Sequence, residues 1–350
     1  MKKKALLVGC NYPGTSYPLQ GCVNDVNLMA DVLTQHFGFE AANRRMLTNE
    51  AATTAAMLER LEWLVSDNEP GDVLYFHYSG HGSQMVNQTY EPDFEPDGRD
   101  EIICPHDLNW RDKVIRDDDL KRIFDKVPNG VAFTVVLDCC NSGSGLDQEN
   151  QYQPFGLGGS RKLERVDNER WLPMPDDIYN RSRGLGLDAK PRSVQSRDVN
   201  NTGMLITGCQ AQQTSADAWI GDRFYGAATY YLADSLSKNG WDATHMTIIT
   251  DLNNSMVKYG YSQRPQLDGA ESLFETKFME PTYVGTGLEE PTTAEIVIEA
   301  LPVIEAPVEI VKPPVEAVEE TEQTDDDKTK KWAAIIGGAL FVGFVIFSLI

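Results

Sequence analysis

Short apolar runs alternate with amphipathic stretches through the first 140 residues of the chain. Ala5–Gly9, Val73–Tyr78 and Val131–Leu137 are almost continuously apolar, which predicts strands buried on both faces. Asn24–Phe37 and Thr53–Val65 carry apolar residues three and four positions apart, which predicts helices between those strands. This order is typical of an α/β fold, with a mostly parallel sheet flanked by helices on both faces.

Residues 148–202 interrupt this pattern. They contain scattered Gly and Pro and many basic residues, and a loop of this length inside a compact domain is usually functional or disordered. After the loop, Met204–Cys209 predicts a strand, Arg223–Lys238 and His245–Lys258 predict helices, and Leu273–Phe278 predicts a last strand.

One folded domain, expected to be monomeric, is therefore predicted over residues 1–280. Its larger part is 1–147 and its smaller part is 203–280, with the basic loop 148–202 between them. Residues 281–331 are rich in Pro, Val, Glu and Thr and carry more acidic than basic residues. Such a segment cannot bury a core, so we expect a disordered, extended linker.

Trp332–Ile350 is 19 residues long and contains no charge. As a helix it would span about 28 Å at about 1.5 Å per residue, close to the hydrocarbon thickness of a bilayer. We expect a single-pass C-terminal tail anchor, and Lys328-Thr-Lys-Lys331 before it places the folded domain in the cytoplasm by the positive-inside rule. The alternative is a buried or partner-binding helix. Small residues that permit two anchors to pack together recur at Ala334 and Gly338 and at Ala339 and Gly343.

Charge and cysteine content exclude other classes of function. The net charge of −22 argues against a nucleic-acid partner, because phosphate-backbone binding requires a basic surface. The six cysteines lack C-x-x-C spacing, so we expect free thiols in a reducing compartment. We expect no organic cofactor.

Two predicted strands end in residues suited to nucleophilic catalysis. Val131–Leu137 is followed by Asp138-Cys-Cys-Asn-Ser-Gly143, and Val73–Tyr78 is followed by Ser79-Gly-His-Gly82. A Cys and a His at the carboxyl ends of separate strands can meet in space and form a thiolate–imidazole pair. A buried structural Cys and a hydrogen-bonded loop His are the more common fates of each residue alone. The combination of spacing and flanking glycines favours catalysis.

At these residues the chain resembles the metacaspases and their prokaryotic relatives, the orthocaspases, in peptidase family C14 of the caspase-like clan. The resemblance covers roughly residues 3–280 with a gap in the middle, and it implies a caspase-like fold and cysteine endopeptidase activity. The matching phrases are Leu19-Gln-Gly-Cys-Val-Asn-Asp25, Tyr78-Ser-Gly-His-Gly82, Asp100-Glu-Ile-Ile-Cys-Pro105, Ile115-Arg-Asp-Asp-Asp119, Asp138-Cys-Cys-Asn-Ser-Gly143 and Leu205-Ile-Thr-Gly-Cys209.

The resemblance assigns roles at the two strand ends. Its register makes Cys140 the nucleophile and leaves Cys139 as the weaker rival, with His81 as the proton acceptor and later donor. It also implies that the backbone N–H groups of Gly82 and Cys140 stabilise the oxyanion. Asn141 stands where the family often has His, which puts the geometry beside the nucleophile in doubt.

A selectivity pocket is predicted from three further positions. Asp138 and Ser79 each lie two residues before a catalytic residue and therefore share its strand face. Asp25 opens a predicted helix, where a simple capping role is the alternative. The resemblance implies that these three residues form an acidic pocket for Arg or Lys. One desolvated ion pair at about 4 Å is worth up to about 4 kcal/mol at an effective dielectric of 20.

The resemblance also implies a calcium site. Its ligands would be the carboxylates of Asp100, Asp117, Asp118 and Asp147, and oxygen ligands of this kind suit Ca²⁺. A solvated acidic surface beside a helix N-terminus is the alternative.

The sequence therefore predicts a membrane-anchored endopeptidase that cleaves protein or peptide substrates after Arg or Lys, with calcium stimulation and self-processing. A catalytically silent, membrane-tethered scaffold is the alternative from another class, and an Asn-specific legumain-like enzyme is disfavoured by the acidic pocket. Self-cleavage is expected in the basic loop, although the loop could also remain uncut. The candidate residues are Arg161, Lys162, Arg165, Arg181, Arg183, Lys190, Arg192 and Arg197.

Overall fold

A computed structural model of the 350-residue chain describes residues 1–86, 99–140, 168–178, 203–210 and 213–280. The predicted linker, the predicted tail anchor and most of the basic loop lie outside these ranges. Among the described residues, no helix is both long and apolar enough to cross a membrane.

A six-stranded sheet forms the centre of the domain, in the order β12-β9-β7-β3-β1-β2. Five strands are parallel and β12 is antiparallel at one edge, so the expectation of a mostly parallel sheet is confirmed. Their bounds are β1 Lys3–Gly9, β2 Arg44–Thr48, β3 Val73–Ser79, β7 Ala132–Asp138, β9 Gly203–Thr207 and β12 Gln266–Gly269.

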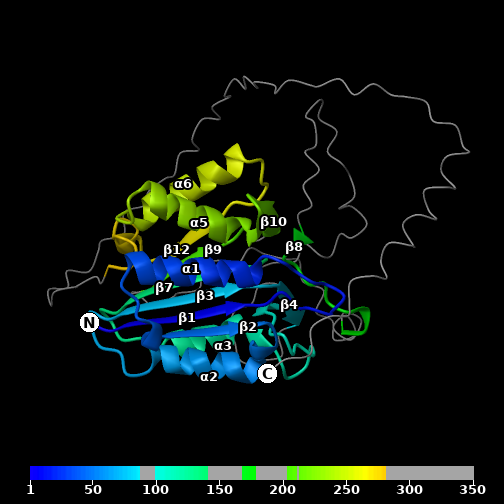
Figure 1. Cartoon of the computed structure of the whole chain (residues 1–350). Helices are drawn as coiled ribbons and strands as arrows, with labels where there is room; N and C mark the ends of the chain where they lie inside the picture. Colours follow the sequence, from blue (N-terminus) through cyan, green and yellow to red (C-terminus); the bar gives the residue numbers. More distant parts are fainter. Residues whose placement is uncertain (87–98, 141–167, 179–202, 211–212, 281–350) are drawn as a thin grey trace, which may run out of the picture. The chain divides into compact units, whose positions relative to one another are not determined.

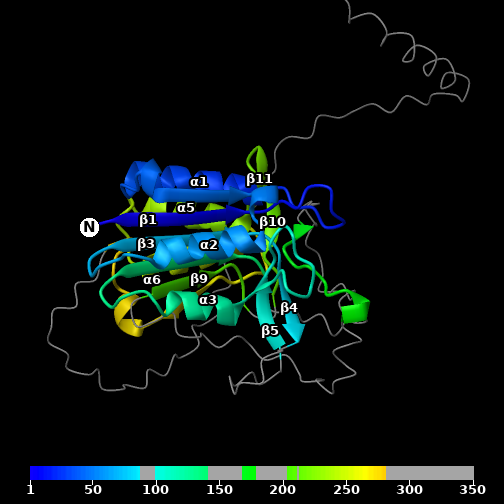
Figure 2. The same ribbon diagram turned by 90° about the horizontal axis from the view of Figure 1, so that it is seen from below.

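Helices cover both faces of this sheet, as the alternating pattern predicts (Figures 1 and 2). One face carries α1, α5 and α6, and the other carries α2 and α3. The bounds are α1 Cys22–His36, α2 Thr54–Val65, α3 Asp117–Phe124, α5 Ala227–Lys238 and α6 His245–Lys258, with 3₁₀ turns η1 Ala41–Asn43, η2 Asn49–Ala51 and η3 Glu271–Leu273.

Two apolar clusters, one on each face, hold these layers together. Leu6, Phe76 and Val135 point toward α2 and α3, whereas Leu7 and Tyr75 point toward α1, α5 and α6. Successive strand residues thus face opposite cores, which is why the strands read as continuous apolar runs.

Two small sheets lie beyond the carboxyl ends of β1 and β3 (Figure 1). Their strands have only two to five residues each, so the apolar pattern does not predict them. One sheet contains β4 Gly82–Val86, β5 Arg99–Ile103 and β6 Ile115–Arg116, and the other contains β8 Asn168–Glu169, β10 Ala216–Ile220 and β11 Arg223–Gly226.

Two sequence predictions are wrong in the second half of the domain. The helix expected from Arg223 begins only at Ala227, because residues 223–226 pair with β10 as an antiparallel hairpin. The last strand is Gln266–Gly269 rather than Leu273–Phe278. Leu273 and Phe278 are buried, but the chain around them turns and bonds to the start of α6.

Candidate active site

The strand pairing brings Cys140 and His81 to one edge of the sheet. β3 and β7 are parallel neighbours with Ser79 opposite Asp138, so the residues two positions further on leave the sheet side by side. Cys139 belongs to the apolar cluster on the α2 and α3 face, whereas Cys140 does not. The six cysteines, all of which lie in the described ranges, are free and buried.

His81 is oriented by backbone groups of the segment after β1. Its Nε2 lies 2.8 Å from the carbonyl oxygen of Tyr17, and its ring packs on that of Tyr12 at 4.7 Å. A carbonyl only accepts, so Nε2 carries the proton and Nδ1 is the basic nitrogen of the neutral ring. No described residue hydrogen-bonds to this buried Nδ1, which leaves it available as a base. A backbone carbonyl thus orients this ring, whereas a carboxylate orients the His of catalytic triads.

Burial disfavours the charged forms of both His81 and Cys140. It lowers the pKa of His81 to about 4, although the hydrogen bond to the Tyr17 carbonyl opposes the shift. It also raises the pKa of Cys140 well above the ordinary thiol value. The Cys140 Sγ accepts a hydrogen bond from the backbone N–H of Ser215 at 3.0 Å. The arrangement is therefore that of a neutral thiol beside a neutral imidazole, rather than a preformed thiolate–imidazolium pair.

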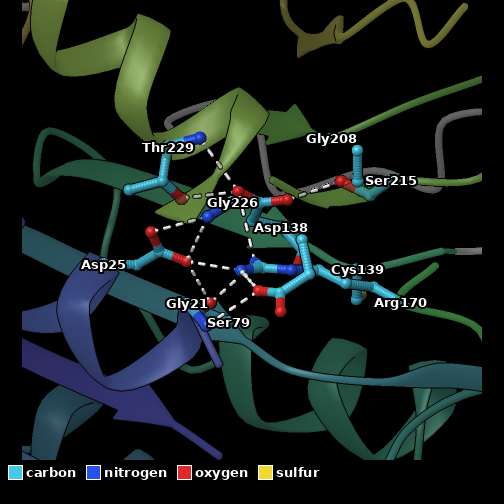
Figure 3. Close-up of polar contacts among 12 residues, drawn as sticks. Gly21, Asp25, Ser79, Asp138, Cys139, Arg170, Gly208, Ser215, Gly226 and Thr229 are labelled. Carbon is cyan, nitrogen blue, oxygen red and sulfur yellow. Dashed lines mark hydrogen bonds and ion pairs between the residues drawn. The ribbon is translucent and has the colours of Figure 1, made fainter. Parts of the chain in front are cut away.

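The three predicted pocket residues converge on the guanidinium of Arg170, which is 0% exposed (Figure 3). Arg170 NH2 lies 2.7 Å from Asp25 Oδ2, and NH1 donates to Ser79 Oγ at 2.7 Å. NH1 also lies 3.4 Å from Asp138 Oδ2. The three residues assigned to the pocket therefore lie around one guanidinium of the chain itself.

Asp217 on β10 is a third carboxylate of the pocket, and the sequence analysis misses it. Its Oδ1 lies 3.0 Å from Arg170 NH2, and its side chain also accepts from the backbone N–H groups of Gln20 and Gly21. An acid between Ala216 and Ala218 in a strand is a detectable signal, but β10 itself was not predicted. The pocket therefore combines residues from α1, β3, β7 and β10.

Fixed donors hold the carboxylates in place. Asp138 accepts from Ser215 Oγ at 2.6 Å and from Thr229 N and Oγ1 at 2.9 and 2.7 Å. Burial alone would raise the pKa of Asp138, but the Arg170 charge and these donors keep it below its ordinary value. Burial raises the pKa of Asp25 to about 6, although Arg170 opposes the shift. Asp138 is therefore the more firmly ionised of these two groups.

The backbone of Arg170 lies against both proposed oxyanion donors. Its carbonyl oxygen accepts from Gly82 N–H at 3.0 Å and from Cys140 N–H at 3.4 Å. A Cβ on residue 82 would collide with the carbonyl oxygen of Cys140, so this approach requires Gly. Two donors on one carbonyl are the arrangement that stabilises a tetrahedral oxyanion.

The predicted calcium ligands are only partly described. Asp100 on β5 is buried with its Oδ2 2.9 Å from Arg116 Nε, and Asp117 and Asp118 begin α3. Asp147 and Asn141 lie outside the described residues. Within the described ranges no group of three or more His, Cys, Asp or Glu residues is placed to hold a metal. The Arg116 guanidinium is the counter-charge of one of the four carboxylates, Asp100.

The sequence and the fold of this chain are similar to those of known proteins. A family described as "Metacaspase, peptidase C14 domain" matches residues 3–149. Metacaspase-1A of Aspergillus fumigatus is 32% identical over 294 residues, which cover 78% of this chain and 70% of the relative. Metacaspase-1 of Meyerozyma guilliermondii is 31% identical, with 77% and 70% covered. A crystal structure of a protein from Geobacter sulfurreducens has the same fold, with a TM-score of 0.55 and 24% identity over 79% of this chain and 98% of that chain.

Proposed function

The chain belongs to the metacaspases, a family of cysteine endopeptidases with a caspase-like fold, and we propose that it cleaves peptide bonds after Arg or Lys. The observation that supports this selectivity most strongly is the set of buried carboxylates around the guanidinium of Arg170. A neutral or acidic side chain in the same place would leave these groups desolvated and without a counter-charge.

The proposed reaction begins with proton transfer from the Cys140 thiol to Nδ1 of His81. The sulfur attacks the carbonyl carbon of the substrate Arg or Lys, and the N–H groups of Gly82 and Cys140 stabilise the oxyanion. His81 then donates its proton to the departing amine. Water hydrolyses the thioester, which releases the new carboxylate and restores the thiol.

A covalent probe tests this proposal. A short peptide that ends in an arginyl chloromethyl ketone should alkylate Cys140 of the full chain, and peptide mapping should find the adduct on that residue. The matched aspartyl probe should react at least about tenfold more slowly, because it carries no cation for the pocket. Equal labelling by both probes, or an adduct on Cys139 alone, would reject the proposed roles.

Calcium stimulation is part of the proposed function, although no step above depends on it. The structural support is a group of carboxylates: Asp117 and Asp118 begin α3, close to the Asp100–Arg116 pair. Asp147 would have to complete the site. The family resemblance is the remaining argument for Ca²⁺ over a solvated acidic surface.

Neutralising Asp117 and Asp118 together to Asn should weaken calcium binding by at least about tenfold, because hard cations depend on charged oxygen ligands. Calorimetric titration of the full chain with Ca²⁺ measures this directly, and peptide cleavage gives a second readout. Asp125→Asn at the other end of α3 is the matched control and should bind as the wild type does. Identical titrations for the wild type, the double variant and Asp125→Asn would exclude a calcium site at Asp117 and Asp118.

We further propose that Trp332–Ile350 anchors the enzyme in a membrane, with the peptidase domain in the cytoplasm; this segment lies outside the described residues. The full chain should remain in the membrane pellet after alkaline carbonate extraction, whereas a chain that ends at Lys331 should be soluble. Protease added to sealed vesicles should digest the domain only from the cytoplasmic side. Release of the full chain by carbonate would contradict the anchor.

A further inference from the structure

The structure assigns Arg170–Trp171 as the peptide bond that this enzyme cuts in its own chain, within the same molecule. The inference rests on the proposed function and names the substrate that is already in the site. Sequence analysis passes over Arg170 because nothing in the sequence distinguishes it from the other basic residues of the loop. The evidence comes from the contacts on both sides of the bond.

Upstream of the bond, the chain lies along β10 as a peptide substrate would. Asn168 and Glu169 form β8, which pairs antiparallel with Asp217 and Ala216 of β10. The backbone N–H of Arg170 donates to the carbonyl oxygen of Ser215 at 2.9 Å, which continues this pairing to the pocket. Strand addition of this kind aligns the main chain while a side-chain pocket provides specificity.

At the bond itself, both proposed oxyanion donors meet one carbonyl. The Arg170 oxygen lies between the Gly82 and Cys140 N–H groups, and the Arg170 side chain fills the pocket of Asp25, Asp138 and Asp217. A structural salt bridge would explain the side-chain contacts alone. It would not explain a carbonyl that accepts hydrogen bonds from both oxyanion donors.

Downstream of the bond, the chain is held by β4. Leu172 N–H donates to the carbonyl oxygen of Gly82 at 3.1 Å, and Ser83 Oγ donates to the carbonyl oxygen of Leu172 at 2.7 Å. Trp171 and Gly82 form an isolated parallel bridge. The two sides of the bond are therefore held by separate strands, β10 upstream and β4 downstream, so the cut lets the Arg170 end leave β10 without releasing the Trp171 end from β4.

Hydrolysis of this bond requires no co-reactant other than water. Cys140 sulfur bonds to the Arg170 carbonyl carbon, and the C–N bond breaks as the Trp171 nitrogen takes the proton held by His81. Water then hydrolyses the thioester. The products are a carboxylate on Arg170 and a new amino terminus at Trp171.

Two consequences follow from the burial of Arg170. The uncut segment fills the pocket and the oxyanion site, so it excludes other substrates until it is cut and the Arg170 end leaves. Because the side chain is 0% exposed, the site of another molecule cannot reach the bond. The first cut should therefore be intramolecular.

Intact-mass analysis and N-terminal mapping of the full chain in detergent, over time after calcium addition, test the bond. Wild type should yield a fragment that begins at Trp171, and Cys140→Ala should yield none. Arg170→Lys should still be cut there, more slowly, because Lys keeps the charge but not the forked geometry. Arg170→Gln should not be cut there, and the control Arg165→Gln should behave as the wild type does.

Cleavage of an added arginyl peptide, followed in parallel, tests the exclusion of other substrates. Wild type should show a lag that ends as the Trp171 fragment appears, with a rise in rate of roughly tenfold or more, since a tethered competitor acts at an effective millimolar concentration. Arg170→Gln, which cannot fill the pocket with a cation, should show no lag.

The rate of the first cut should not change over a tenfold range of protein concentration, and wild type should leave added Cys140→Ala chains intact at residue 170. The inference would be overturned if the wild type cleaved peptides while its own chain stayed uncut at Arg170. It would also be overturned if the wild type cut Cys140→Ala chains at this bond in mixtures. Either result would leave the proposed function standing. Failure of wild type, Arg170→Lys and Arg170→Gln alike to cleave any arginyl peptide would reject the proposed function itself.

Discussion

Cys140→Ala should lower peptide cleavage by about 10³-fold or more, because it removes the sulfur that we propose forms the thioester. Removal of a nucleophile that acts together with its base typically leaves only the contribution of binding and of the oxyanion donors. His81→Ala should cause a loss of similar size, since we propose its buried Nδ1 as the base that takes the thiol proton. The measurement is kcat/KM on an arginyl peptide with the full chain.

Cys139→Ala is the matched control for this experiment. The Cys139 side chain packs in the apolar cluster on the opposite face of the sheet, so its loss should affect stability more than turnover. We expect most of the wild-type activity to remain. Wild-type turnover in Cys140→Ala, or a complete loss in Cys139→Ala with an unchanged melting temperature, would place the nucleophile one residue earlier.

Asp217→Asn should reduce kcat/KM for arginyl peptides by roughly 30-fold or more. The substitution keeps the volume but removes one charge facing the substrate guanidinium, and breaking a buried, hydrogen-bonded charge pair costs about 2 kcal/mol or more. Cleavage of peptides with a neutral residue before the scissile bond should change far less. The preference for Arg, measured as a ratio of kcat/KM values, should therefore fall.

Asp222→Asn controls for a general effect of charge. This acid lies on the exposed turn between β10 and β11 and pairs with Arg223 rather than with the pocket. Its removal should leave the arginyl preference unchanged. An Asp217→Asn enzyme with the wild-type preference would show that β10 supplies only backbone contacts to the substrate.

Much of the central sheet is predictable from the sequence because each of its inner strands is buried on both faces. Val73–Tyr78 and Val131–Leu137 could hardly adopt another structure, and they end within a residue or two of the observed β3 and β7. The hairpin β10–β11 and the strand β12 escape prediction because their polar residues reflect contacts within a site or at a sheet edge. Apolar periodicity carries no information about such contacts.

The sequence likewise predicts some residues of the candidate active site and not others. Asp25, Ser79 and Asp138 could be assigned because motif phrases mark them, and the structure brings them together. Tyr17 contributes through its backbone carbonyl, which leaves no trace in residue identity. Arg170 is one basic residue among many in a long loop, and only the three-dimensional contacts show which of them fills the pocket.

The most direct test of the central claim is a fluorogenic peptide panel on the full chain in detergent with calcium. The peptides differ only in the residue before the scissile bond, which is Arg, Lys, Asn or Asp. The carboxylates of Asp25, Asp138 and Asp217 predict that kcat/KM for Arg and Lys exceeds that for Asn and Asp by about 100-fold or more. Efficient cleavage after Asp or Asn, or equal cleavage of all four peptides, would contradict an acidic selectivity pocket.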